Sequence, residues 1–127
     1  MAGLDDSLAD LDGFGWIPGV QQILDGIHTA QQAATEGRLP LEATQTLLAL
    51  LGNDGGPDLM EALAHLAVHI TNPDTNPALN AIDDDTAKTV QHLGELHAHT
   101  IADTPRHHTT EAAGLIDHAA TTGRNPA

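Results

Sequence analysis

The chain has 127 residues, which is enough for one domain with its own apolar core, and it contains no cysteine. The missing cysteine excludes disulfides, thiolate nucleophiles and cysteine-bound zinc or iron–sulfur clusters. Its 18 acidic and 4 basic residues give a formal net charge of -14, which disfavours binding to nucleic-acid phosphates and to anionic membranes.

The first ten residues, MAGLDDSLAD, are acidic where a secretory signal would be basic. No apolar run in the chain approaches the length of a membrane span. We therefore expect a soluble, cytoplasmic protein. Residues 1–17 are predicted to be an acidic lead followed by a glycine-rich loop, because Gly13, Gly15 and Gly19 surround Pro18.

The single phenylalanine and the single tryptophan of the chain, Phe14 and Trp16, lie two positions apart in this loop. One interpretation is that both side chains fold back and close the open end of the helical core. The other is that they anchor a partner protein, because exposed aromatic side chains dominate many interfaces. The first interpretation is favoured from the sequence, and the second stays open.

Beyond the loop, apolar residues recur at helical spacing between glycine and proline breakers, and no segment alternates like a β-strand. The predicted helices span about 18–36, 40–51, 57–71, 85–103 and 107–121. We expect an all-α fold, a compact single-domain bundle or orthogonal array of about five helices over residues 18–121. Residues 122–127 are predicted to form a flexible tail.

Acidic residues cluster at 5–12, 54–61 and 83–85, and a strongly negative domain is steered toward basic partners. Capping of helix N-termini is the alternative explanation for the second and third clusters. The residues predicted to bind a partner are Phe14, Trp16, Asp54, Asp58, Asp83, Asp84 and Asp85.

Histidines recur along the third and fourth predicted helices, where they could ligate a metal. His65 and His69 lie one turn apart, and His92, Glu95 and His99 follow downstream. On a helical wheel both sets lie away from the leucine-rich stripe of their helix, so we expect them to face water. The metal-binding alternative assigns zinc, nickel or iron to His65, His69, His92, Glu95 and His99. We assign no chemistry to His107 and His108.

No phosphate-binding loop, dinucleotide-binding glycine pattern or nucleophile elbow is present, so the sequence favours a binding protein without a cofactor over an enzyme. The predicted function is a small acidic helical interaction protein that binds a basic partner surface, as an inhibitor, antitoxin- or immunity-like factor, adaptor or nucleic-acid mimic. The first alternative is a histidine-rich metal-binding bundle or metalloenzyme. The second is a structural subunit of a phage or shell, with homo-oligomerisation.

Overall fold

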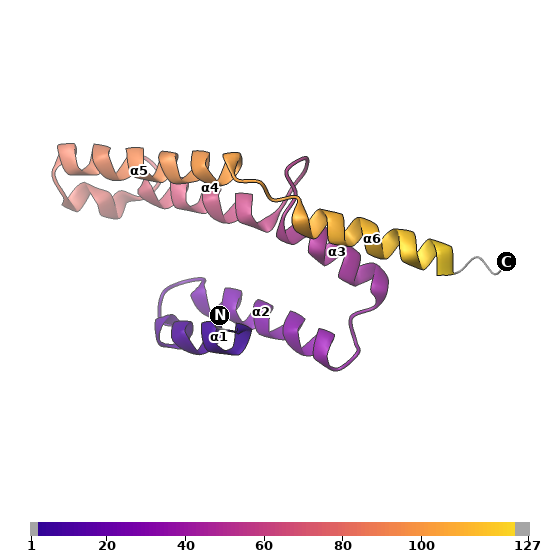
Figure 1. Ribbon diagram of the computed structural model, residues 1–127. Coiled ribbons are helices and arrows are strands. Elements are labelled where there is room, and N and C mark those ends of the chain that lie inside the picture. The colour runs from indigo at the N-terminus through magenta and orange to yellow at the C-terminus, as the bar shows by residue number, and fades with distance from the viewer. Residues whose placement is uncertain (1–2, 124–127) are drawn as a thin grey trace. The chain divides into compact units, whose positions relative to one another are not determined.

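The computed structural model describes residues 3–123, which form six α-helices and two short 3-10 helices without a β-strand (Figure 1). The all-α prediction is confirmed. The elements are α1 (Leu4–Leu11), η1 (Asp12–Phe14), α2 (Val20–Thr35), α3 (Leu41–Leu51), α4 (Leu59–Thr71), η2 (Pro77–Ala81), α5 (Asp84–Asp103) and α6 (His108–Gly123).

The five predicted helices correspond to α2 to α6, and no boundary differs from its prediction by more than two residues. The helix predicted from Pro18 begins at Val20 instead. Gly19 lies in the left-handed region, at φ +91°, and it therefore cannot be part of an α-helix. At the other end, α6 includes 122 and 123 of the predicted tail, and the remaining residues, 124–127, lie outside the described residues.

Helix α1 was not expected, because its segment was predicted only as an acidic lead. Leu4, Leu8 and Leu11 nevertheless share one side of the helix, at spacings of four and three residues. Asp5 and Asp6 lie in the first turn, where negative charge interacts favourably with the positive end of the helix dipole. The sequence therefore carried a short amphipathic helix signal that the acidic composition obscured.

Contacts within the chain define an N-terminal unit, Met1–Leu41, and a C-terminal unit, Glu42–Ala127. The boundary falls inside the range 18–121, and the prediction that this range forms one domain stays a prediction. In the N-terminal unit α1 packs against α2. Gln31 Nε2 donates a hydrogen bond of 2.7 Å to Asp5 Oδ1, and Leu24 is the buried apolar residue between the helices.

In the C-terminal unit α4 and α5 form an antiparallel hairpin (Figure 1). The side chains between them are small. Ala64 and Gly94 are buried, and a Cβ atom added at Gly94 would overlap the Thr71 hydroxyl. Small residues let two helix backbones approach closely, so this hairpin packs through alanine and glycine rather than through leucine.

The leucine-rich stripes of α4 and α5 lie outside this contact. The expectation that these stripes face inward, with the histidines on the water-facing side, is therefore wrong for the leucines. Each of these large side chains is between 45% and 58% exposed. They are Leu59, Leu63, Leu66 and Ile70 of α4 with Leu93 and Leu96 of α5. No helix within residues 3–123 combines the length and the apolar character that crossing a membrane requires.

Candidate functional site

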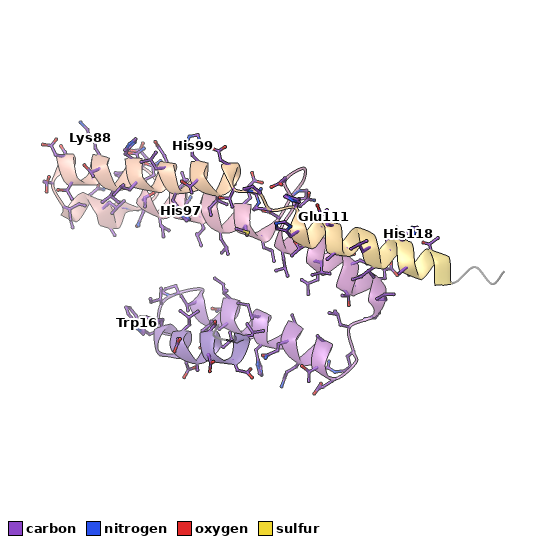
Figure 2. The ribbon with its side chains drawn as sticks, in the orientation of Figure 1. Trp16, Lys88, His97, His99, Glu111 and His118 are labelled. Carbon is purple, nitrogen blue, oxygen red and sulfur yellow. The ribbon has the colours of Figure 1, made fainter. Side chains whose placement is uncertain are left out.

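Trp16 is the most exposed of the large apolar side chains described, with 80% of its surface accessible, and Phe14 is 49% exposed. Figure 2 shows Trp16 projecting from the turn between α1 and α2. Hydrogen bonds from Ile17 N to Phe14 O and from Val20 N to Ile17 O hold this turn, both at 3.1 Å. The interpretation that Trp16 closes the core is therefore wrong for the unit that carries it.

Acidic residues outnumber basic residues in the N-terminal unit, which carries this aromatic pair. Residues 1–41 contain six acidic residues and one basic residue, Arg38, whose guanidinium pairs with Glu36 at 2.5 Å. The acidic residues of α1 and η1 are all exposed, and they are Asp5, Asp6, Asp10 and Asp12. The unit therefore combines a presented tryptophan with an excess of negative charge.

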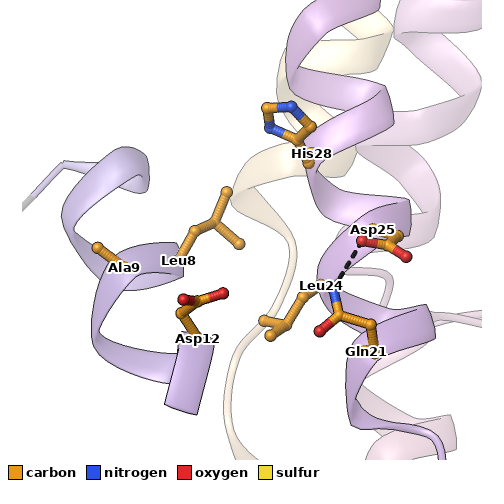
Figure 3. Close-up of a pocket in the computed structure, with 7 residues that line it drawn as sticks. All are labelled: Leu8, Ala9, Asp12, Gln21, Leu24, Asp25 and His28. Carbon is orange, nitrogen blue, oxygen red and sulfur yellow. Dashed lines mark hydrogen bonds between the residues drawn. The ribbon is translucent and has the colours of Figure 1, made fainter. Parts of the chain in front are cut away.

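A hollow of about 320 Å³ lies between α1 and α2 in the same unit (Figure 3). Figure 3 shows Leu8 and Leu24 pointing toward each other across it. Asp12 and Asp25 supply carboxylates, and Gln21 Nε2 donates a hydrogen bond of 2.8 Å to Asp25 Oδ1. The remaining lining residues are Ala9 and His28. An apolar floor with carboxylates suits the aliphatic stem and charged head of a lysine or arginine.

The hollow is not predictable from the sequence without α1, which forms one of its two walls. The spacing of Leu4, Leu8 and Leu11 was the signal that could have found it, since the stripe places Leu8 toward a second apolar helix. The two carboxylates of the hollow come from different elements, η1 and α2, so no local motif links them.

Asp58, predicted to bind a partner, is instead buried in an ion pair. Its side chain is 0% exposed, and Asp58 Oδ2 accepts hydrogen bonds of 2.6 Å from Arg106 Nε and of 2.8 Å from Asn53 N. Asp58 Oδ1 caps α4 by accepting a bond of 2.7 Å from Glu61 N. Because every oxygen is committed inside the protein, this carboxylate is not available to a basic partner surface.

Hydrogen bonding lowers the pKa of Asp58. Burial by itself raises this pKa, but the bonds donated by the Asn53 and Glu61 amides and by Arg106 outweigh burial, so the pKa lies below its ordinary value. The hydrogen bond to Asp58 raises the pKa of Arg106 in turn. Both residues therefore carry full charge near neutral pH.

The other predicted acidic residues are exposed. Asp54 Oδ1 accepts a hydrogen bond of 2.8 Å from Arg106 N, and its second oxygen lies 3.6 Å from His107 Nδ1. Asp83 caps α5, where bonds from the amide and hydroxyl of Thr86 lower the pKa of its carboxyl group. Asp84 and Asp85 occupy the first turn of α5. Asp83, Asp84 and Asp85 therefore stabilise the start of α5, which is the alternative explanation for this cluster, and their side chains remain accessible to a partner.

The structure brings three of the five predicted metal ligands to one hollow. His65, Glu95 and His99 line a depression of about 330 Å³ along one edge of the α4–α5 hairpin, with Val68, Ala98 and Ala102. His69 and His92 are exposed and do not line it. Close packing through small residues, which leaves the leucine stripes outside, is what lets histidines of both helices reach the same edge.

Possible metal ligands also lie close together at the start of α6, outside the predicted set. Among residues 3–123, only His107, His108 and Glu111 form a set of at least three histidine or acidic side chains whose ligand atoms all lie within 4.8 Å of one another. No chemistry is predicted for His107 and His108 from the sequence. The signal was the spacing of three and four residues to Glu111, which places a carboxylate beside both imidazoles.

Comparison of the chain with models of protein families, with curated proteins and with solved structures finds no match.

Proposed function

We propose that the protein is an acidic helical interaction protein whose N-terminal unit binds a basic surface of another protein. The observation that carries this proposal is the 80% exposure of Trp16 in a unit with six acidic residues and one basic residue. Tryptophan is enriched among residues that dominate interface energies, and its exposure to water is unfavourable unless a partner covers it.

The parts of the unit have distinct roles in this proposal. Trp16 and Phe14 anchor the partner by entering an apolar pocket on its surface. The hollow between α1 and α2 takes up one lysine or arginine of the partner, with the stem against Leu8 and Leu24 and the charged head near Asp12 and Asp25. Asp54 and Asp83 to Asp85 add long-range steering from the C-terminal unit.

Selection from a library of random peptides displayed on phage tests the proposal. The wild-type protein should enrich peptides rich in lysine and arginine. Trp16→Ser should bind a selected peptide at least about 30-fold more weakly, corresponding to the loss of about 2 kcal/mol expected for an interface anchor. The matched control is Leu115→Ser, which removes an apolar side chain that is 70% exposed on α6. Equal weakening by both variants, or by neither, would contradict the role of Trp16.

Two charge variants test the role of the hollow. Asp12→Asn with Asp25→Asn removes both carboxylates of the hollow, whereas Asp103→Asn with Asp117→Asn removes the same charge from α5 and α6. The first pair should weaken binding of the selected basic peptides about tenfold more than the second pair, because only the first removes hydrogen-bonded recognition of a cation. Equal effects of the two pairs would contradict a role of the hollow in recognising a cation and would leave Asp12 and Asp25 with long-range steering only.

If the natural partner is itself a nucleic-acid-binding protein, double-stranded DNA should compete with this chain for the partner. Such competition would place the protein among nucleic-acid mimics, because carboxylates would then occupy a surface that binds phosphates. Binding that DNA does not affect would favour an inhibitor or adaptor.

A further inference from the structure

We propose that His107, His108 and Glu111 form a binding site for a zinc ion at the start of α6. The imidazoles and the carboxylate each offer one ligand atom, and these atoms lie within 4.8 Å of one another. His107 Nε2 is 3.6 Å from Glu111 Oε1. Because zinc holds nitrogen and oxygen ligands at about 2.0–2.2 Å, small side-chain rotations bring all three onto one ion. None of the three ligands belongs to the proposed partner-binding surface, although Asp54, which contributes steering there, lies beside His107.

A carboxylate lies within ion-pair distance of the second nitrogen of His107. His107 Nδ1 faces Asp54 Oδ2 at 3.6 Å, while His107 Nε2 faces the ligand oxygen of Glu111. Histidines that bind zinc through one nitrogen usually donate the other N–H group to a carboxylate, which fixes the tautomer and the ring orientation. Asp54 is therefore a positioning residue for this site rather than a ligand.

The backbone on both sides of the two histidines is held in place. On one side, Arg106 N donates to Asp54 Oδ1 at 2.8 Å, and the Arg106 side chain is buried against Asp58. On the other side, the Thr109 and Thr110 hydroxyls donate to Gly52 O at 3.0 and 2.5 Å. Ligands that the scaffold already holds in position lose less freedom when the ion binds.

Charge and ligand type favour a divalent ion of the first transition row. The positive end of the α6 dipole opposes a cation, but the carboxylates of Glu111 and Asp54 offset it, and the protein as a whole carries a formal charge of -14. Imidazole nitrogens suit zinc, whereas magnesium and calcium prefer oxygen ligands. Three protein ligands leave the fourth tetrahedral position for water.

Calorimetric titration of the full chain with zinc chloride tests the site. One zinc ion should bind per chain and should raise the thermal unfolding midpoint, because the ion binds the folded form. His107→Ala with His108→Ala should abolish saturable binding. Asp54→Asn should weaken it about 10- to 100-fold, as loss of a carboxylate behind a metal-bound histidine does. Magnesium and calcium should give no saturable heat.

The matched control is His65→Ala with His99→Ala, which removes two histidines from the hollow on the α4–α5 edge and should leave zinc binding unchanged. The exposed His107 and His108 are outside the buried ion pair, and helical circular dichroism verifies that each variant folds. Zinc binding that survives in His107→Ala with His108→Ala and disappears in the control pair would overturn the proposal. The absence of saturable zinc binding to the wild type would overturn it as well.

Discussion

At the scale of single residues, the Asp58–Arg106 ion pair joins parts of the C-terminal unit that lie far apart in the sequence. The residues are 48 positions apart, and the side chains are 0% and 5% exposed. Arg106 also donates to Ile101 O and, through its backbone, to Asp54. The pair therefore ties the start of α4 to both the end of α5 and the start of α6.

Replacing only one partner of this pair should be strongly destabilising. Asp58→Ala leaves Arg106 buried without its counter-charge and removes the α4 cap, so we expect the free energy of unfolding to fall by about 3 kcal/mol. Urea unfolding followed by helical circular dichroism measures the change. Asp58→Leu with Arg106→Met should cost less than Asp58→Ala, because no unpaired charge remains. A double variant less stable than Asp58→Ala would contradict this explanation.

The same carboxyl group should make the protein sensitive to acid. Its pKa lies below the ordinary value in the folded state, so at pH values between the folded and unfolded pKa the unfolded state binds more protons. The stabilising contribution of Asp58 is therefore complete above about pH 4 and is lost as the pH falls through the folded pKa. Urea unfolding at a series of pH values should show a shallower decline for Asp58→Asn than for the wild type. Parallel declines would assign the acid sensitivity to other carboxylates.

Trp16 allows a direct measurement of exposure, since it is the single tryptophan of the chain. A side chain that is 80% exposed should emit with a red-shifted maximum and should be quenched by acrylamide as readily in the folded protein as in urea. Addition of a selected basic peptide should shift the emission to the blue and protect the indole. A blue-shifted, protected tryptophan in the free protein would contradict the anchor role.

At the scale of elements, helical periodicity and breaker residues predicted where α2 to α6 lie but not which faces pack. Leucine has the larger apolar surface, so a wheel places the interior at Leu59, Leu63 and Leu66. The α4–α5 hairpin instead packs through Ala64 of α4 and Gly94 of α5, which are buried. Burial of one small side chain contributes little free energy. Its advantage is that two helix backbones can approach closely, and this advantage depends on the partner helix, so the sequence of a single helix does not reveal it.

The candidate sites also depend on contacts between residues that are distant in the sequence, and the sequence alone does not reveal these contacts. The exposure of Trp16 follows from a turn whose sequence is glycine-rich, and it agrees with the second of the two interpretations drawn from the sequence. The role of Trp16 in binding a partner stays a prediction. By contrast, the burial of Asp58 depends on Arg106, which is distant in the sequence. The sequence could predict Asp58 as a helix cap from its position before α4, but it could not identify the cation that commits the second oxygen.

Gly94 provides a test of the close approach between α4 and α5. Gly94→Ala should lower the free energy of unfolding by about 1–3 kcal/mol, because the new methyl group overlaps Thr71. Thr71 cannot easily move away, since its hydroxyl donates to Ala67 O at 2.7 Å. Gly114→Ala is the matched control, as nothing lies within 4 Å of a Cβ there, and it should stabilise α6 by about 0.5–1 kcal/mol. Stabilisation by both substitutions would show that the helices are farther apart.

At the scale of the whole molecule, charge is the property that the sequence describes most completely, because a net charge requires no knowledge of the fold. The 18 acidic residues against 4 basic residues act together on an approaching cation. The described structure adds that most of these carboxylates are accessible and that Asp58 is not. In the proposed function, long-range attraction therefore comes from the whole molecule, whereas short-range recognition is assigned to the N-terminal unit.

This division predicts how salt should affect binding to a selected lysine- and arginine-rich peptide. The screening length shortens from about 10 Å at 0.1 M salt to about 3 Å at 1 M, so salt should suppress attraction from distant carboxylates more than contacts at the anchor. Stopped-flow fluorescence of Trp16 should show an association rate constant that falls at least about tenfold over this range, with a much smaller change in the dissociation rate constant. Trp16→Ser, followed through a label on the peptide, should show the opposite pattern, with faster dissociation and nearly unchanged association, because the substitution leaves the net charge at -14. An association rate that salt does not change would show that the acidic surface plays no part in recruiting the partner.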